Sequence, residues 1–499
     1  MLTVLLIYFG VLLILSRWVA RKDDNDTFFR GNRRSPWWLV SFGMIGASIS
    51  GLTFIGVPGW VITTDMTYMQ MCFGFVVGYL IVAFVLLPLY YRLRLTSIYS
   101  YLSMRFGSAS YATGSAFFIL SKLLGASAKF YVVVRVLQTC VGEQYGLSYE
   151  ATAAMTLAFI WLYTHRSGIR SLVWTDAVQT LVLIVCLVLI LLRVCSMLEM
   201  GVPQAWQAVW QDSHSRMFEF GNLVSRQYFW KQFLSGVFVV IVMTGLDQDM
   251  MQKNLTCRSL REAQLNMCTY GVMFVPVNFL FLSLGILLLM LYARLGMPLP
   301  DSGDALLTNV VFSGTLGHAA LVFFTVGVVA SAFSSADSAL TALTTTFCID
   351  ILHMESDSIL GAEIALKKER TRKWVHLGMM LLFLLFTLAF NVLDGGSVMD
   401  LIYTLVSYTY GPLLGLFAFG LLTNRRPVDH YVIFMAVLAP LLCIAIEYAS
   451  RYFLSYRFGY EMLMFNGLLT FVGLYLLPVS SSVPRENRSD NVGRAGRGL

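Results

Sequence analysis

The chain has 499 residues, of which 57% are hydrophobic and only 13% are charged. A soluble domain has about 25% charged and about 45–50% apolar residues, so this composition excludes an ordinary soluble enzyme. The mean hydropathy is +0.71, and the apolar residues form long blocks near the ~20 residues that cross a bilayer as a helix. The sequence therefore predicts a polytopic membrane protein, and the net charge of +7 has to be interpreted by position.

Thirteen apolar segments follow one another along the chain. Their length fits packed helices better than the ~10-residue alternating strands of an outer-membrane barrel. We predict an all-α protein with about 13 transmembrane helices at residues 2–20, 36–64, 67–91, 111–141, 149–164, 171–198, 228–252, 263–293, 317–346, 374–392, 398–422, 430–448 and 461–478.

The basic residues fall mainly on one side of these spans. With the N-terminus outside, the inner loops hold 25 of the 35 Lys and Arg residues, Lys253 among them, and the outer loops hold 7. The other three, Lys122, Lys129 and Arg135, lie within a span. The positive-inside rule then predicts an outer N-terminus and an inner C-terminus. Topology explains the basic excess, so no nucleic-acid partner is expected.

The domain organisation is simple. Residues 1–478 are predicted to form one transmembrane domain, and the polar residues 479–499 a disordered cytoplasmic tail. We find no phosphate-binding loop and no mid-membrane catalytic histidine, so we expect no enzyme. We expect a multi-pass plasma membrane protein, in a bacterial inner membrane, whose partners are solute, ions and lipid without an obligate protein subunit.

Two spans are interrupted by glycine and polar residues. The second contains Ser48-Ile49-Ser50-Gly51, and the seventh contains Gly245 followed by Asp247-Gln248-Asp249. Interruptions five spans apart predict inverted repeats at about 36–198 and 228–422. In such transporters unwound mid-membrane carbonyls coordinate a cation. The alternative is that the glycines only permit close helix packing.

The ninth span is rich in hydroxyl groups. Ser331, Ser334, Ser335 and Ser338 lie three, four and seven residues apart and share one helix face, next to Asp337. Oxygen ligands suit a hard cation, although serines also join helices in membranes. Asp176 in the sixth span marks an ion path or a buried pair with a nearby arginine.

These pieces resemble the sodium:solute symporter family, which includes sodium–glucose, sodium–proline, sodium–iodide and sodium–sialic acid carriers. The resemblance runs from about residue 2 to 478 and rests on the order and spacing of several motifs. The motifs are Ser48 to Gly56 (SISGLTFIG), Pro88 to Arg92 (PLYYR), Tyr99 to Leu102, Arg105 to Gly107, Trp174 to Gln179 (WTDAVQ), Asp247-Gln248 with Gln252, Ser259 to Ala263, the serine-rich ninth span and Gly411 to Gly415 (GPLLG).

The resemblance implies a five-plus-five inverted-repeat (LeuT-like) core with alternating access driven by sodium. The implied sodium ligands are the carbonyls of Gly46, Ile49 and Ser331 and the hydroxyls of Ser334 and Ser335. Gly46 and Ser331 occupy positions where alanine is usual. Because their implied ligands are backbone carbonyls, a different side chain leaves these ligands in place.

Some members of the family bind a second sodium ion. The matching positions are Asp176, Ser334, Asp337 and Ser338, and Asp337 replaces a hydroxyl. Two close carboxylates need a cation between them, so this pair holds sodium or shares a proton.

The resemblance places the solute on the outer side of the sodium. A buried Lys122 pairs with an anionic solute or with an acid such as Asp247, while Lys129 and Arg135 are expected to extend to the outer interface. The candidate solute residues are Ser50, Thr53, Gln70, Lys122, Asp247, Gln248, Tyr403, Thr404 and Ser407.

The sequence predicts a sodium-coupled symporter that imports a small polar organic solute, sugar-like or a carboxylated sugar such as sialic acid. The alternatives are import of an inorganic anion such as iodide, import of an amino acid, and proton coupling.

Overall fold

The computed structural model describes residues 2–19, 25–165, 168–354, 362–392, 398–454 and 456–479. Across these ranges the regular structure is helical, with two isolated β-bridges. The segment predicted as a disordered tail lies outside the described residues from 480 onwards.

The helices of the first half are α1 (Leu2–Val19), α2 (Asn25–Arg30), α3 (Trp37–Ser48), α4 (Gly51–Thr64), α5 (Tyr68–Ile81), α6 (Leu87–Arg92), α7 (Ser100–Arg105), α8 (Ser108–Leu137), α9 (Tyr149–Thr164) and α10 (Ile169–Met197). Those of the second half are α11 (Val202–Gln211), α12 (Phe229–Val240), α13 (Gln248–Asn254), α14 (Leu260–Leu295), α15 (Ala305–Phe312), α16 (His318–Thr346), α17 (Ala362–Val392), α18 (Val398–Leu422), α19 (Asp429–Leu454) and α20 (Glu461–Leu476). Four π-helical turns extend helices at Val82–Leu86, Gln138–Gly142, Ile241–Gly245 and Phe347–Ile351.

The described residues contain nine helices long and apolar enough to cross a membrane, or up to eleven if each of two bent helix pairs is one span. This defines a multi-pass membrane protein. α9 and α20 are shorter, with 16 residues each. α17 begins at residue 362, twelve residues before the predicted span at 374–392, so part of the polar segment expected at 348–373 is helical.

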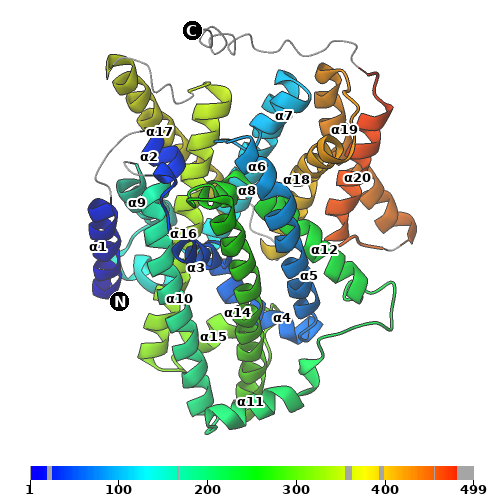
Figure 1. Ribbon diagram of the computed structural model, residues 1–499. Coiled ribbons are helices and arrows are strands. Elements are labelled where there is room, and N and C mark those ends of the chain that lie inside the picture. The colour runs from blue at the N-terminus through cyan, green and yellow to red at the C-terminus, as the bar shows by residue number, and fades with distance from the viewer. Residues whose placement is uncertain are drawn as a thin grey trace, which may run out of the picture.

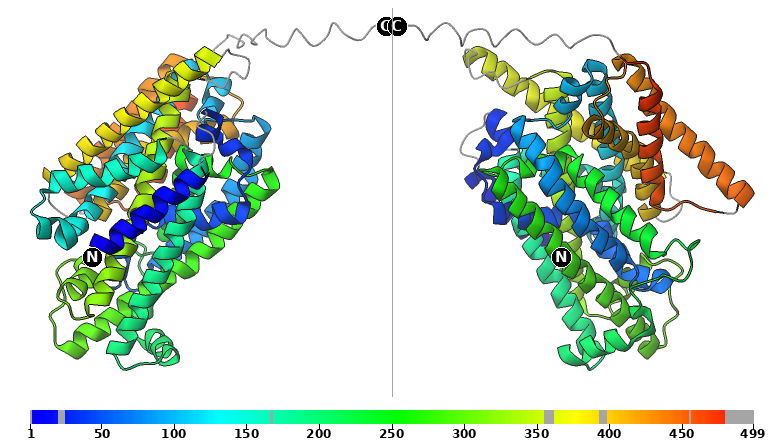
Figure 2. Two further views of the ribbon diagram at one scale, coloured as in Figure 1. Left: turned by 90° about the vertical axis from the view of Figure 1, so that its left-hand side faces the viewer. Right: turned by 45° about the vertical axis from the view of Figure 1, so that its right-hand side comes forward.

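The helices form one bundle (Figures 1 and 2). α10 packs against α16 and α3, and α1 packs on α10 and α9 at one flank of the bundle. α19 and α20 pack together at the opposite flank, where α20 also contacts α18. α11 lies across one end of the bundle, while α6 and α7 lie toward the other end (Figure 1). This arrangement surrounds the two bent pairs with other helices.

Both predicted interruptions are confirmed. α3 and α4 meet at 63°, and α12 and α13 with their connecting turn meet at 70°. At the first break Ile49 and Ser50 are extended, and at the second Asp247 is extended and its carboxylate caps α13 by accepting from the Asp249 N–H at 2.9 Å. Because extended residues interrupt the helical ladder, backbone carbonyls are exposed at both breaks.

Candidate ion and solute sites

The first break lies directly against α16. The hydroxyl of Ser331 donates to the carbonyl of Ile49, and the hydroxyl of Ser335 donates to that of Ala47 at 3.2 Å. Carbonyl and hydroxyl oxygens from two helices thus meet at one point inside the protein, which is the ligand chemistry that a hard cation such as sodium takes.

Gly46 lies on the opposite face of this break, against α10. A Cβ at Gly46 would lie 2.1 Å from Oγ1 of Thr180, so the two backbones approach more closely than an alanine allows. The Thr180 hydroxyl donates to the carbonyl of Asp176 at 2.7 Å. Thr180 therefore fills the space that the usual alanine side chain would need.

Ser334, the remaining predicted ligand, contacts Asp176. Its hydroxyl donates to Oδ1 of Asp176 at 2.8 Å, and the Ser338 hydroxyl lies 3.5 Å from Oδ2. The structure thus brings α10 and α16 together around one buried carboxylate, as expected for the second candidate site.

A lysine also contacts that carboxylate. Nζ of Lys253 lies 2.8 Å from Oδ2 of Asp176 and 3.9 Å from Oδ1 of Asp249, and the Lys253 and Asp176 side chains are 2% and 1% exposed. The prediction that Lys253 lies in an inner loop is wrong. Lys253 lies on α13, inside the protein, because the second broken helix continues beyond the predicted end of its span at residue 252.

Asp337 is also fully buried. Its Oδ2 accepts a hydrogen bond from the Tyr163 hydroxyl at 2.7 Å, while its Oδ1 receives none within the part of the chain that the structure describes. Asp337 interacts electrostatically with both Asp176 and Lys253. The cation that the sequence analysis required between these acids is therefore supplied by the chain itself.

Lys122 has acidic partners within the protein. Its Nζ lies 3.1 Å from Oδ2 of Asp247 and 2.7 Å from Oδ2 of Asp249, and the Tyr410 hydroxyl donates to Asp247 at 2.7 Å. Of the two interpretations of Lys122, the structure favours the internal ion pair. This pair joins α8 and α18 to the second break.

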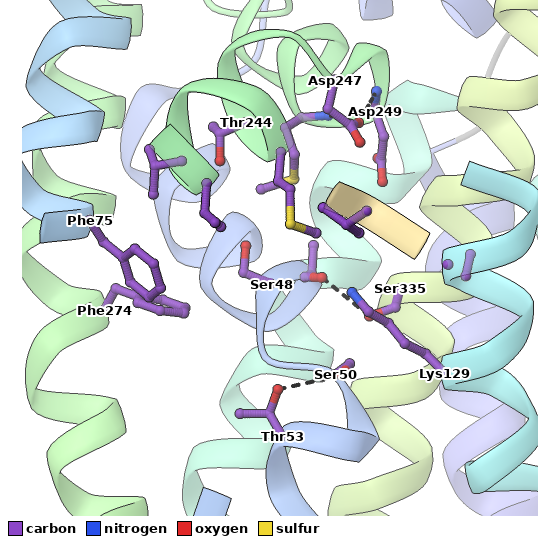
Figure 3. A pocket seen from close by; sticks show the side chains of 18 of the residues that line it. Ser48, Ser50, Thr53, Phe75, Lys129, Thr244, Asp247, Asp249, Phe274 and Ser335 are labelled. Carbon is purple, nitrogen blue, oxygen red and sulfur yellow. Dashed lines mark hydrogen bonds between the residues drawn. The ribbon is translucent and has the colours of Figure 1, made fainter. Parts of the chain in front are cut away.

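A cavity of about 150 Å³ lies between the two breaks. Ser50, Thr53, Lys122 and Asp247 of the candidate solute residues line it. Figure 3 shows Ser335 and Lys129 on one side of this cavity, Phe75 and Phe274 on the opposite side, and Asp247 with Asp249 at one end. The other lining side chains are mainly apolar, and they include Val57, Tyr68, Tyr79, Val239, Val240, Met243, Met250 and Val406.

Lys129 also lines this cavity. It lines the wall beside Ser50 and Ser335, and it forms no ion pair or hydrogen bond with another described residue. The expectation that Lys129 extends to the outer interface is wrong. The sequence does contain a signal, because Lys129 is seven residues after Lys122 and so shares its helix face.

A second cavity, of about 890 Å³ and more polar, lies toward the end of the bundle that carries α11. Thr404 and Ser407 line this outer cavity and not the cavity between the breaks. Tyr68 lines both cavities, and its ring packs edge-on against Trp60 with ring centroids 4.7 Å apart. These two aromatic rings stand between the cavities.

Two of the predicted solute residues lie in neither cavity. The amide of Gln70 donates to the carbonyl of Gln227 at 2.9 Å and accepts from the Glu219 N–H at 3.0 Å, so Gln70 holds the loop that precedes α12. Gln248 holds another loop and is described below. Tyr403 lies on α18 at a position whose side chain falls outside the described residues.

The loop between α6 and α7 is fastened to the second break. Tyr99 donates its hydroxyl to the carbonyl of Leu246 at 2.9 Å, and Gln248 accepts from the Ile98 N–H at 3.0 Å and donates to the carbonyl of Thr96 at 2.8 Å. These hydrogen bonds hold the loop against the second break, and α6 and α7 lie toward the end of the bundle away from α11 (Figure 1).

Two broken helices beside a hydroxyl-rich helix, with a cavity between them, define a secondary transporter of ions and solutes. The profile of the sodium:solute symporter family matches residues 28–429. The chain belongs to this family and is a sodium-coupled solute transporter.

Individual relatives are distant. The chain is 23% identical over 464 residues to the sodium/sialic acid symporter SiaT of Proteus mirabilis, covering 89% of this chain and 88% of the relative. It is 26% identical over 412 residues to the human sodium/iodide cotransporter, covering 79% and 61%. Its fold matches the substrate-bound outward-open structure of a Na⁺-coupled sialic acid symporter with a TM-score of 0.81, 20% identity, and coverage of 96% and 98%.

Proposed function

We propose that the protein imports a small organic anion together with sodium, and that the anionic group binds at Lys129. The solute that we put first is a carboxylated sugar such as sialic acid. The observation that carries this proposal is a lysine that lines the cavity and forms no ion pair with another described residue, beside the hydroxyls of Ser50 and Thr53.

The charges around the cavity support an anion over a cation or a neutral sugar. Lys122 is neutralised by two aspartates, so it does not need a solute charge. A partly buried ammonium without an ion pair is costly, and a solute carboxylate would supply the opposite charge through charge-assisted hydrogen bonds. The sialic acid and iodide relatives are both named for anions.

A thermal-shift screen of acids, neutral sugars and amino acids, in sodium and in potassium buffer, tests the proposal. Acids should stabilise the protein, and more so in sodium. Lys129→Met should weaken acid binding at least about 30-fold, the equivalent of about 2 kcal/mol for breaking one side of a buried charge pair, while Lys129→Arg retains most of it.

Lys231→Met is the matched control, because Lys231 lines the outer cavity and bonds there to the Val224 carbonyl. Equal weakening of acids and neutral solutes by Lys129→Met would contradict the proposal.

An inorganic anion such as iodide is the second candidate. The small volume of the cavity and its apolar wall of Phe75, Phe274 and Tyr79 favour a compact, weakly hydrated anion. Iodide that stabilises the protein in sodium and competes with no organic acid in the screen would select this candidate.

We also propose the sodium ligands and the number of membrane spans. The sodium ligands would be the carbonyls of Gly46, Ile49 and Ser331 and the hydroxyls of Ser334 and Ser335, which the contacts between α16 and the first break support. Thirteen spans would result from the nine long helices, the two bent pairs, α9 and α20.

The two bent pairs support inverted repeats at about 36–198 and 228–422. The distribution of basic residues supports an outer N-terminus and an inner C-terminus. We place the protein in a bacterial plasma membrane, as a transporter that needs no obligate protein partner.

A further inference from the structure

The second candidate sodium site contains the ammonium group of Lys253. In relatives that bind two sodium ions, an aspartate and hydroxyls matching Asp176, Ser334 and Ser338 would surround the second ion. Here Nζ of Lys253 lies 2.8 Å from Oδ2 of Asp176, the atom that would otherwise face the ion, while Oδ1 of Asp176 accepts from Ser334 at 2.8 Å. Both oxygens of this carboxylate already have partners.

The ammonium of Lys253 supplies the positive charge of the site. Its acidic neighbours are Asp176, Asp249 and Asp337, and its side chain is 2% exposed. A sodium ion placed at Asp176 would lie next to this ammonium and be repelled by it. The residues present therefore do not fit a second sodium ion.

At the first site no described lysine is bonded to a proposed ligand, although Lys129 lines the wall beside Ser335. The oxygens of this site come from the first break and from one face of α16, where Ser331 and Ser335 contact the backbone carbonyls. Ser334 lies between the two sites. Because its hydroxyl donates its proton to Asp176, the lone pairs of the hydroxyl oxygen can still coordinate a cation.

We propose that Lys253 is a tethered substitute for a second sodium ion, so that the protein binds and transports a single sodium ion per cycle. This inference rests on the sodium coupling of the family and not on which solute is carried. It assigns a specificity-determining role to a residue of α13.

The test is equilibrium binding of ²²Na⁺ to the purified protein without solute, so it does not depend on the proposed anion. The unmodified protein should bind about one sodium ion per chain at saturation, with a Hill coefficient of about one. Lys253→Met removes the ammonium and leaves Asp176 free, so this variant should bind about two, with a Hill coefficient above one.

The double variant Asp176→Asn with Lys253→Met is the control, because it lacks both the ammonium and the carboxylate. It should return to about one sodium ion. Two sodium ions bound to the unmodified protein would overturn the inference, and so would a folded Lys253→Met variant that still binds one. If Lys253→Met does not fold, the count for the unmodified protein decides the matter.

Discussion

The close approach of Gly46 and Thr180 allows a test of the first sodium site that leaves every proposed ligand chemically intact. In Gly46→Ala the new Cβ would lie 2.1 Å from Oγ1 of Thr180, about 1.3 Å short of the 3.4 Å of ordinary contact. Neither partner is a flexible chain end, so α3 must move relative to α10. Overpacking of this kind costs about 1–3 kcal/mol of stability.

The displacement also moves the Gly46 carbonyl, which is a proposed ligand. We therefore expect Gly46→Ala to raise the sodium concentration for half-maximal uptake at least about tenfold, equivalent to ~1.4 kcal/mol. The second substitution Thr180→Ala removes the clashing oxygen and leaves contacts of 3.1 Å to the Cβ and 3.2 Å to the Cα of residue 180. It should restore most of both the sodium affinity and the thermal midpoint.

Sodium-dependent uptake into proteoliposomes and thermal unfolding measure these two effects. Gly378→Ala on α17 is the matched control, because a Cβ there meets nothing within 4 Å. If Gly46→Ala behaves like Gly378→Ala, or if Thr180→Ala fails to rescue it, the Gly46 carbonyl does not ligate sodium.

Three further predictions follow from the contacts of individual side chains. Ser335→Ala should raise the sodium concentration that uptake requires without reducing expression, because it removes one of about five oxygen ligands of the sodium ion. An unchanged sodium requirement would show that the site lies elsewhere. Lys122→Gln should lower the free energy of unfolding by about 3–5 kcal/mol, because two buried aspartates lose their cation. Denaturant unfolding in detergent measures this change. A variant that keeps its stability but binds acidic solutes more weakly would instead make Lys122 a solute ligand. Asp337→Asn should still transport at saturating sodium, because Lys253 contacts Asp176 directly, and abolished uptake would show that Asp337 is an obligatory ligand.

The sequence predicted the breaks and the oxygen-rich helix because both depend on local chemistry. Glycine and polar residues inside an apolar span, such as Ser48 to Gly51, indicate an unwound segment without knowledge of any neighbour. Hydroxyls at helical spacing in α16 likewise define a common face.

The partners of the buried charges could not be predicted in the same way. Lys253 follows a break, so a hydropathy boundary ended the span one residue too early and assigned its charge to a loop. Its contact with Asp176 joins residues 77 positions apart, which only the packing of α13 on α10 determines. The same is true of Gln70 and Gln248, whose buried amides could equally serve a solute or a loop until their neighbours are known.

The fastening of the α6–α7 loop has a mechanical consequence. The carbonyl of Leu246 and the amide of Gln248 hold this loop, and Asp247 between them faces the solute cavity. The anchor of this loop and one wall of the cavity are therefore parts of one short unwound segment. The loop cannot move without disturbing Asp247, and a displacement of Asp247 is transmitted to the loop, so the loop is mechanically linked to the wall of the cavity.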